Sequence, residues 1–529
     1  MFTSEMSTNQ WSLYLQDNIS WSERFRMSVG ARLELPSYPS LANNFNQGYY
    51  DLDFGGRHFR TDNVPSASVS FSPRVGFNWD MTGDRKYILR GGTGLFVGRM
   101  PFVWLVSAVG NSGMGQTSYW AVQSKGDKVP SFTMSQEDML KQIGATSATS
   151  IPSSPTILSE DLRMPKTWKA SLAFDAKLPY DIDFTLEGIY NWDLNPVVVS
   201  NANVYWDVDP NTGVGPTIDL GHGDVRHKMS TYQKQSAYLL ENAGSKAHYA
   251  SLSFQLHKNF DFGLDLSASY TLSTAKSYSE GIGDQVSSAY NNYRNSIHAV
   301  NDNETGYATY VAPNRILVSA SYKLKESANS SSTFSLLWDA YQYGYLGSYS
   351  YSRYSYIFAS NVNNDPSAPG NLIYVPASRQ ELNNWEFKEG KVGGETYTAE
   401  MQRDDFWAFI QQDDYLKNRT GQYAERGGAK MPWHHQLDFR YMRDMSFKAG
   451  KTKHTLQLGL DIENLLNFLC KDWGLYKQIT GNNLLTYDSK TNQYQYNLVN
   501  GARHLSTSQN YETTASTYRI QFTIRYLFN

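Results

Sequence analysis

The sequence predicts an all-β protein whose strands form a transmembrane antiparallel β-barrel. Three observations predict this class: apolar and polar residues alternate with a period of two, the alternating segments run to roughly 10 to 15 residues, and short turns are followed by long loops. A soluble sandwich or propeller would alternate too, but its strands average about five or six residues. No propeller repeat of about 40 residues is visible. Strands in lipid must close into a barrel, because an open edge would leave backbone groups unpaired.

Composition supports this class and excludes others. Tyr accounts for 38 of 529 residues and charged residues for 18%, which disfavours a soluble helical enzyme, while the aromatic content of 14% disfavours disorder. The net charge of -3 gives no basic face, so we expect no nucleic-acid partner. The single cysteine, Cys470, cannot form an intrachain disulfide. No apolar run of about 18 residues is present, and the mean hydropathy of -0.53 suits alternating strands with polar loops.

The strands can be placed in order along the chain. Alternation is clearest near the C-terminus, where Tyr518, Ile520 and Phe522 share one face and Arg519 and Gln521 share the other. We expect thirteen strands, at 10–19, 25–35, 70–80, 86–98, 164–177, 181–194, 246–258, 262–274, 309–324, 332–345, 432–447, 453–466 and 515–528. We expect long loops at 36–69, 99–163, 195–245, 275–308, 346–431 and 467–514. Aromatics at strand ends fit the two interfacial girdles of such barrels: Trp11, Trp79, Tyr87, Trp168, Tyr190, Trp338 and Trp433.

An odd number of strands is unexpected for a bacterial barrel, which has an even number and both termini in the periplasm. With the long loops outside, the first strand would run inward and the last would end in the periplasm. The first residues also lack the basic and apolar regions of a signal peptide. We therefore expect residues 1–529 to be one domain, the C-terminal part of a larger barrel whose plug domain and early strands are absent from this chain.

Several segments resemble TonB-dependent outer-membrane receptors, over the chain from about residue 10 to its end. The motifs that carry the resemblance are Trp11–Asp17 with Met27–Leu33, Ser72–Phe77, Leu89–Phe96 with Gly98–Phe102, Asp461–Asn467 with Lys471–Gly474, and the closing strand Tyr518–Phe528. The set is most similar to the Oar-like branch of Bacteroidota, in which a carboxypeptidase-regulatory-like domain precedes plug and barrel. The SusC-like transporters are the close alternative. One departure is the last residue, Asn529, which places the terminal aromatic Phe528 one position inboard.

The resemblance implies a barrel of about 22 strands, of which this chain would supply the last thirteen. It implies outer-membrane lipid, an N-terminal plug and barrel segment, and TonB acting through that segment as partners. A SusD-like or other surface lipoprotein would join them if the SusC-like alternative holds. Ligand uptake across the outer membrane of a Gram-negative, Bacteroidota-like bacterium is the expected function. The alternative is a structural barrel subunit of a multiprotein outer-membrane complex, with loops that bind protein partners.

No enzyme or cofactor motif stands out, and we expect no enzymatic activity. His434 and His435 are adjacent on one strand and so point to opposite faces, which favours a girdle or rim role over a metal site. The acidic pairs 404–405 and 413–414 in the longest loop could ligate Ca²⁺ through hard oxygens. The alternative for these pairs is a solvated loop.

Two further groups of side chains are candidates for a site. Five tyrosines share a face if their strand continues far enough, and they then form either an aromatic girdle or a stacking surface for a sugar or peptide at the barrel mouth: Tyr341, Tyr343, Tyr345, Tyr349 and Tyr351. The charged inner face is expected to contact lumen water or a plug, with five arginines as its candidates: Arg74, Arg90, Arg440, Arg519 and Arg525.

Overall fold

The computed structural model describes residues 4–116, 121–126, 128–144, 149–280, 285–291, 294–367 and 370–528. Asn529, the departure noted at the C-terminus, lies outside these residues. Within them, one fourteen-stranded antiparallel sheet dominates the fold. Thirteen of its strands follow one another in chain order: β1 (Asn9–Ser20), β2 (Phe25–Ser37), β3 (Ser70–Asp80), β4 (Tyr87–Val97), β6 (Lys166–Leu178), β7 (Ile182–Asp193), β14 (His248–Asn259), β15 (Leu264–Ser277), β17 (Asn314–Ser327), β18 (Ser330–Gln342), β28 (Trp433–Ala449), β29 (Thr452–Glu463) and β34 (Arg519–Phe528).

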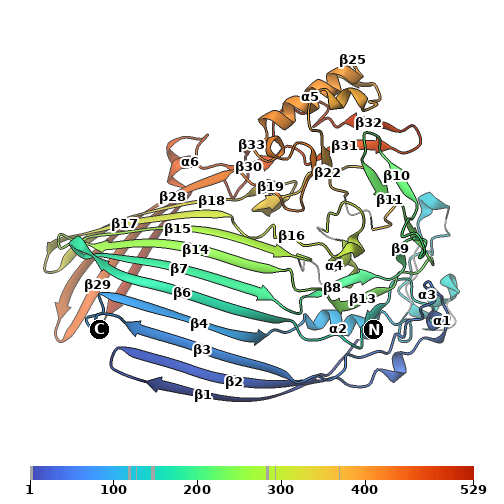
Figure 1. The fold of residues 1–529 in the computed structure, drawn as a ribbon. Coiled ribbons are helices and arrows are strands. Elements are labelled where there is room, and N and C mark those ends of the chain that lie inside the picture. The colour runs from blue at the N-terminus through green and yellow to red at the C-terminus, as the bar shows by residue number, and fades with distance from the viewer. Residues whose placement is uncertain are drawn as a thin grey trace.

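These strands are the thirteen that the sequence predicts, which confirms the fold class. Figure 1 shows the short turns at the left end of the sheet and the long loops at the right. Positive φ angles at Gly263 (+94°) and Gly450 (+64°) allow two of the tight turns. A side chain at Gly263 would also meet the carbonyl oxygen of Lys323, because its Cβ would lie 2.5 Å away.

Most predicted strand ends differ from the observed ones by a few residues, and four of these differences have a local reason. The strand expected from 309 starts at Asn314, directly after Pro313, which has no N–H to donate to the ladder. The strand expected to reach 345 ends at Gln342, where the chain turns into a hairpin. At Asn464 the backbone enters the left-handed region (φ 53°) and the side chain caps α6, so β29 ends at Glu463. Ser516 bonds the Tyr511 carbonyl instead of joining β34.

The strand register gives the sheet one continuous apolar face. Phe77 pairs with Gly91, which pairs with Leu172, and the same face continues through Leu252 and Leu272. Side chains on this face stay open to the surroundings; Leu252, for example, is 38% exposed. Aromatic residues lie at both ends of it, including the pair Trp168 and Tyr190 with ring centroids 6.1 Å apart. A belt of this kind with aromatic borders is the surface that a barrel presents to lipid.

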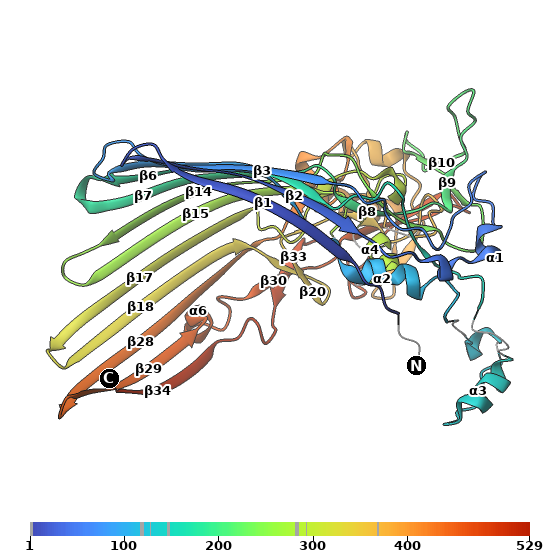
Figure 2. The same cartoon turned by 90° about the horizontal axis from the view of Figure 1, so that it is seen from below.

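The opposite face is polar, and its charges pair across neighbouring strands. Arg90 of β4 contacts Asp175 of β6 at 2.9 Å and Glu187 of β7 at 3.5 Å. Arg315 and Asp339 form a similar pair between β17 and β18 at 2.7 Å. Figure 2 shows that the sheet is curved. In the described residues β1 pairs only with β2 and β34 only with β29, so the curved sheet has two open edges.

The long loops fold into small sheets and helices of their own. β16 (Gly306–Tyr307) extends β15, and the other loop strands are β5 (Thr156–Leu158), β8 (Val197–Asn201), β9 (Val204–Trp206), β10 (Thr217–Asp219), β11 (Val225–His227), β12 (Met229–Thr231), β13 (Tyr238–Asn242), β19 (Gly344–Leu346), β20 (Tyr349–Tyr351), β21 (Arg353–Tyr354), β22 (Ile357–Phe358), β23 (Tyr374–Val375), β24 (Gly390–Val392), β25 (Glu395–Tyr397), β26 (Gln422–Tyr423), β27 (Ala429–Lys430), β30 (Tyr476–Ile479), β31 (Asn483–Asp488), β32 (Gln493–Tyr496) and β33 (Ser508–Tyr511). The α-helices are α1 (Gln47–Tyr50), α2 (Phe102–Gly110), α3 (Gln136–Ile143), α4 (Val286–Asn291), α5 (Ala399–Gln412) and α6 (Leu465–Leu469). No helix in the described residues has the length and apolar character needed to cross a membrane.

Much of the loop region packs into a single compact body, which we call the cap: residues 217–227, 343–367, 370–432 and 474–511. Its core is aromatic and includes the buried side chains of Tyr356, Trp385, Phe409 and Tyr494. A second core joins α2, β5, β13 and α4. Figure 1 shows the cap above the loop end of the sheet, with α5 at its top.

Candidate binding site at the cap

The tyrosine-rich segment that follows β18 forms a hairpin instead of a continued strand. β19 pairs antiparallel with β20, with Gly344 opposite Tyr351 and Leu346 opposite Tyr349. The reversal occurs at Gly347, whose φ of +59° favours glycine. Because the chain folds back here, the expected common face for all five tyrosines is not formed. Tyr349 and Tyr351 share a face of the hairpin, and Tyr345 lies on the other.

The first three tyrosines of the run belong to an aromatic cluster around Tyr476. The hydroxyls of Tyr341 and Tyr476 are 3.0 Å apart, and the ring centroids of Tyr343 and Tyr476 are 6.2 Å apart. Tyr345 packs edge-on against Tyr476 at 5.4 Å. His434 stacks on the far side of the cluster with its ring 3.7 Å from that of Tyr476. These contacts fasten the cap to the inner face of β18 and β28.

The neighbouring residue, His435, points to the opposite face of the same strand. Its ring lies 5.9 Å from Trp338 and 6.1 Å from Trp433 on the apolar face, within the aromatic border. His434 is buried on the polar face. The structure thus confirms that these two histidines face opposite sides, as the alternation of a strand requires.

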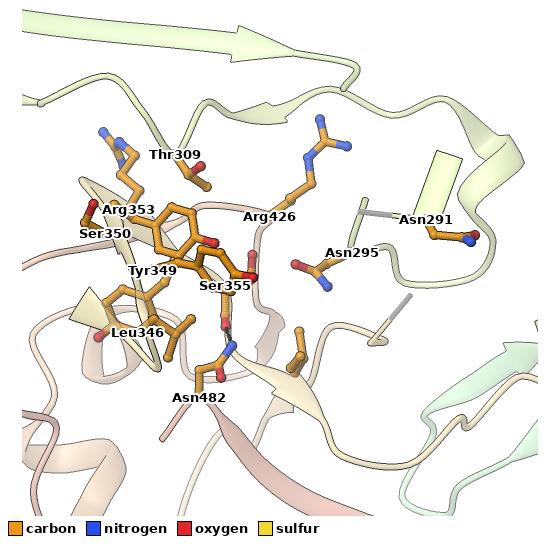
Figure 3. Close-up of a pocket in the computed structure, with 13 residues that line it drawn as sticks. Asn291, Asn295, Thr309, Leu346, Tyr349, Ser350, Arg353, Ser355, Arg426 and Asn482 are labelled. Carbon is orange, nitrogen blue, oxygen red and sulfur yellow. Dashed lines mark hydrogen bonds between the residues drawn. The ribbon is translucent and has the colours of Figure 1, made fainter. Parts of the chain in front are cut away.

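Tyr349 and Tyr351, the last two of the five tyrosines, line a cavity of about 570 Å³ between the cap and the loop that contributes Asn291, Asn295 and Thr309. Figure 3 shows the labelled lining residues coming from several loop segments that are distant in the sequence. The thirteen lining residues are Asn291, Asn295, Thr309, Leu346, Tyr349, Ser350, Tyr351, Arg353, Tyr354, Ser355, Ile357, Arg426 and Asn482. Its volume lies within the range of small-molecule sites, roughly 300 to 1,000 Å³.

The charged lining residues of this cavity are two arginines, with no Asp or Glu among the thirteen. The two Nη atoms of Arg426 donate to the carbonyl oxygens of Ser277 and Tyr278. Burial lowers the pKa of Arg426 to about 10. Arg353 donates from Nη1 to the carbonyl oxygens of Gly427 and Gly428 at 3.3 and 3.4 Å, and burial lowers its pKa as well.

A carboxylate lies just outside the lining. Glu280 accepts from the backbone N–H and hydroxyl of Thr309, each at 3.2 Å, and burial raises the pKa of its carboxyl. The negative charge of Glu280 acts to raise the pKa of Arg426, against the effect of burial. The described residues contain no ion pair between Glu280 and Arg426. Arg353 also lines a neighbouring cavity of about 420 Å³, against the polar residues Ser251 and Ser273 of β14 and β15. Arg353 therefore stands between the cap cavity and the inner face of the sheet.

The acidic pairs of the longest loop hold the cap together. Asp405 is 2% exposed, and it pairs with Arg503 and accepts from the Tyr397 hydroxyl at 2.7 Å. Asp413 is 3% exposed and accepts from Tyr356 at 2.6 Å. The solvated-loop interpretation is therefore wrong for Asp405 and Asp413, because the cap buries them against donors that are distant in sequence. No cluster of three or more His, Cys, Asp or Glu suited to a metal occurs in the described residues.

The five arginines predicted for the inner face mostly contact neighbouring strands. Arg90, Arg440 and Arg519 form ion pairs, the last two with Asp461 and Glu463 of β29. Arg74 packs over the Phe96 ring at 4.6 Å. Arg525 pairs in register with Gln457 on the polar face. Their contacts with a plug stay a prediction.

Sequence reasoning did not find the arginines of the cavity. Arg353 and Arg426 lie in loop strands or next to them, where no periodicity marks a face, and 73 positions (426 − 353) separate them in the chain. The only nearby signal is the tyrosine-rich run that ends at Tyr356. Their convergence depends on how three loops pack.

The sequence matches the family model of the outer membrane beta barrel domain over residues 2–469. The chain belongs to this family. It is accordingly a protein of the Gram-negative outer membrane, and the apolar belt of its sheet is the lipid-facing surface. No curated protein matches the sequence.

Solved structures with similar folds include transporters and receptors of the outer membrane. The outer membrane transporter YddB of Escherichia coli is 11% identical with a TM-score of 0.43, and the match covers 98% of this chain and 45% of YddB. The siderophore receptor PirA of Acinetobacter baumannii is 10% identical with a TM-score of 0.38, covering 87% and 42%. A mutant of the ferric enterobactin receptor PfeA of Pseudomonas aeruginosa is 10% identical with a TM-score of 0.38, covering 98% and 53%. The chain spans about half the length of these proteins.

Proposed function

We propose that this outer-membrane barrel protein takes up a solute across the outer membrane as the C-terminal barrel section of a TonB-dependent transporter. The observation that carries the proposal is a folded cap that holds a cavity at the loop end of an amphipathic sheet. A cap of this kind can bind a solute outside the cell and hold it above the lumen. The motif resemblance to TonB-dependent receptors, in their Oar-like or SusC-like branches of Bacteroidota, supports the energised mechanism.

The two open edges of the sheet support a partner segment that completes the barrel. Both edge strands expose large apolar side chains: Leu13 and Leu15 of β1 are 71% and 81% exposed, and Phe522 of β34 is 79% exposed. In lipid, every backbone group of an edge strand needs a partner. We propose that further strands, from the same polypeptide or a separate chain, pair with β1 and β34, and that this segment carries the plug that TonB engages. The single-domain assignment of residues 1–529 is part of this proposal.

Solute depletion from the medium tests the uptake proposal. Wild-type cells, cells without this gene and cells without TonB are grown in the same complex medium, which is then compared by mass spectrometry. Uptake predicts at least one solute that wild-type cells remove and that both mutants leave behind. Identical depletion by all three strains would overturn the proposal and favour the alternative of a structural barrel subunit. If only the cells without this gene leave a solute behind, the protein takes up that solute, but the uptake does not depend on TonB.

A further inference from the structure

The cap cavity contains positive charge that the protein does not neutralise by ion pairing. Arg353 and Arg426 are 7% and 8% exposed, and within the described residues neither has an Asp or Glu within ion-pair distance. Arg226, another buried arginine of the cap, contrasts with them because it forms an ion pair with Asp224. A buried charge without a counterion is costly, so such sites usually pair with a ligand or another charge.

The free donor positions of these arginines are specific. Nε of Arg426 is buried and has no hydrogen-bond partner in the part of the chain that the structure describes, while its two Nη atoms are fixed by backbone carbonyls. Among the described residues, Arg353 hydrogen-bonds through Nη1 alone, at long distances, and its guanidinium lies 4.4 Å over the Tyr307 ring. Both groups are therefore held in place by their surroundings. Arg426 brings its positive charge to the cavity wall, with Nε turned toward Gly306, and the donors of Arg353 other than Nη1 keep hydrogen-bonding capacity at the cavity.

The remaining lining suits an organic body. Tyr349 is 68% exposed at the edge of the cavity and offers a flat face, while Leu346 and Ile357 add apolar surface. Asn482 is oriented by its hydrogen bond to the Ser355 carbonyl at 2.8 Å, drawn in Figure 3. Aromatic rings bind planar solutes, and guanidinium groups bind carboxylates.

We propose that the cavity lined by Arg353, Arg426 and Tyr349 binds a small organic anion that carries a carboxylate on a planar body. The guanidinium groups attract the carboxylate, and the tyrosine ring packs on the body. Arg353 also lines the neighbouring cavity against β14 and β15, where Lys430 supplies a second basic position for the anion on the side of the sheet. The inference rests on the proposed uptake function only in taking a solute as the occupant.

Binding of fluorescein, a planar carboxylate dianion, tests this inference. The full polypeptide is purified from outer membranes in detergent, and binding is followed by fluorescence anisotropy. Rhodamine 123, which has a similar ring system and a positive charge, is the matched probe. We expect saturable fluorescein binding that weakens as salt is raised, and at least tenfold weaker binding of rhodamine 123. Equal binding of the two dyes, or no saturable binding of fluorescein, would overturn the inference.

Variants locate the site. Arg353→Gln and Arg426→Gln should each weaken fluorescein binding at least tenfold, whereas Arg379→Gln, on the cap surface in ion pairs with Glu400 and Asp404, should not change it. Because Arg426 also holds the 277–278 backbone, the exposed Tyr349 supplies a second pair that spares the cap. Both Tyr349→Glu and Tyr349→Lys lose the ring that packs on the body, but the added negative charge should make Tyr349→Glu bind fluorescein at least tenfold more weakly than Tyr349→Lys. Equal affinity of these two variants would contradict the electrostatic basis of the site.

The binding test and the uptake test fail separately. A protein that imports a solute but binds no fluorescein contradicts the anion site alone. A protein that binds fluorescein with the expected charge dependence, from cells that show no gene-dependent depletion, contradicts uptake alone.

Discussion

Arg226 and Asp224 form an ion pair that is almost completely excluded from solvent, with Nε and Oδ1 2.5 Å apart and both side chains at most 1% exposed. The same guanidinium donates to the carbonyl oxygens of Ile297 and Leu372, at 2.8 and 3.0 Å. One side chain thus joins three loops that are distant in sequence. The cap depends on long-range polar contacts of this kind as well as on its aromatic core.

Replacing Arg226 with methionine should loosen the cap. The change leaves the Asp224 carboxylate buried without its counterion, and losing one partner of a buried pair costs about 3 to 5 kcal/mol. Hydrogen exchange should show faster exchange in residues 217–227 and around Leu372, with the strands of the main sheet unchanged. Arg379→Met, which removes surface ion pairs worth about 0 to 1 kcal/mol, is the control. Equal protection in the two variants would contradict the role of Arg226.

Acidification should also weaken the cap. Burial lowers the pKa of the cap residues His222 and His504 to about 4, from an ordinary value of 6.5. Above pH 6.5 these histidines are neutral in both the folded and the unfolded cap. Between pH 6.5 and 4 the unfolded cap binds protons that the folded cap does not, so stability falls as the pH is lowered. Below about pH 4 the folded histidines titrate too, and the loss stops growing.

The groups around His222 show why burial dominates there. Its ring stacks on Trp385 at 3.9 Å, bonds the Tyr494 hydroxyl at 3.0 Å, and lies 3.9 Å from Glu381. Asp219, Asp224 and Arg226 add opposing charges. Protease protection of the cap, measured from pH 7.5 to 4.5, should decline over this window. His222→Gln should make this decline in protection less steep. If the substitution leaves the pH profile unchanged, His222 is not a source of the pH dependence.

The two faces of the sheet should respond oppositely to a new charge. Leu252→Arg places a cation on the apolar belt of β14, at a cost of about 2 to 4 kcal/mol near the bilayer midplane. Ser253→Arg places it on the polar face of the same strand, where the Ser253 hydroxyl forms a hydrogen bond with the Thr271 hydroxyl at 3.0 Å. We expect Leu252→Arg to lower the amount of folded protein in outer membranes, and Ser253→Arg to leave it near the wild-type level. If Ser253→Arg lowers the amount of folded protein and Leu252→Arg does not, then the face that carries Ser253 is the one that contacts lipid.

The sheet could be predicted from sequence because each strand carries its own signal. Alternation within β29 or β34 is local, and antiparallel neighbours in chain order need no long-range information. The cap could not be predicted in this way. Asp405 and Asp413 lie in a loop with no periodicity, and their partners Arg503 and Tyr356 are remote in sequence. The tyrosine parity was visible, but the turn at Gly347, which divides the tyrosines between a cluster and a cavity, was not.

The orientation of the barrel section is the central claim, and cysteine labelling in whole cells tests it most directly. In the full polypeptide with Cys470 replaced by serine, one cysteine is placed at Ser348, exposed in the cap hairpin, or at Lys451, exposed in a short turn at the other end of the sheet. A membrane-impermeant maleimide should label Ser348→Cys in intact cells, and Lys451→Cys only after the outer membrane is permeabilised. Labelling of Lys451→Cys in intact cells, with Ser348→Cys protected until permeabilisation, would contradict the account.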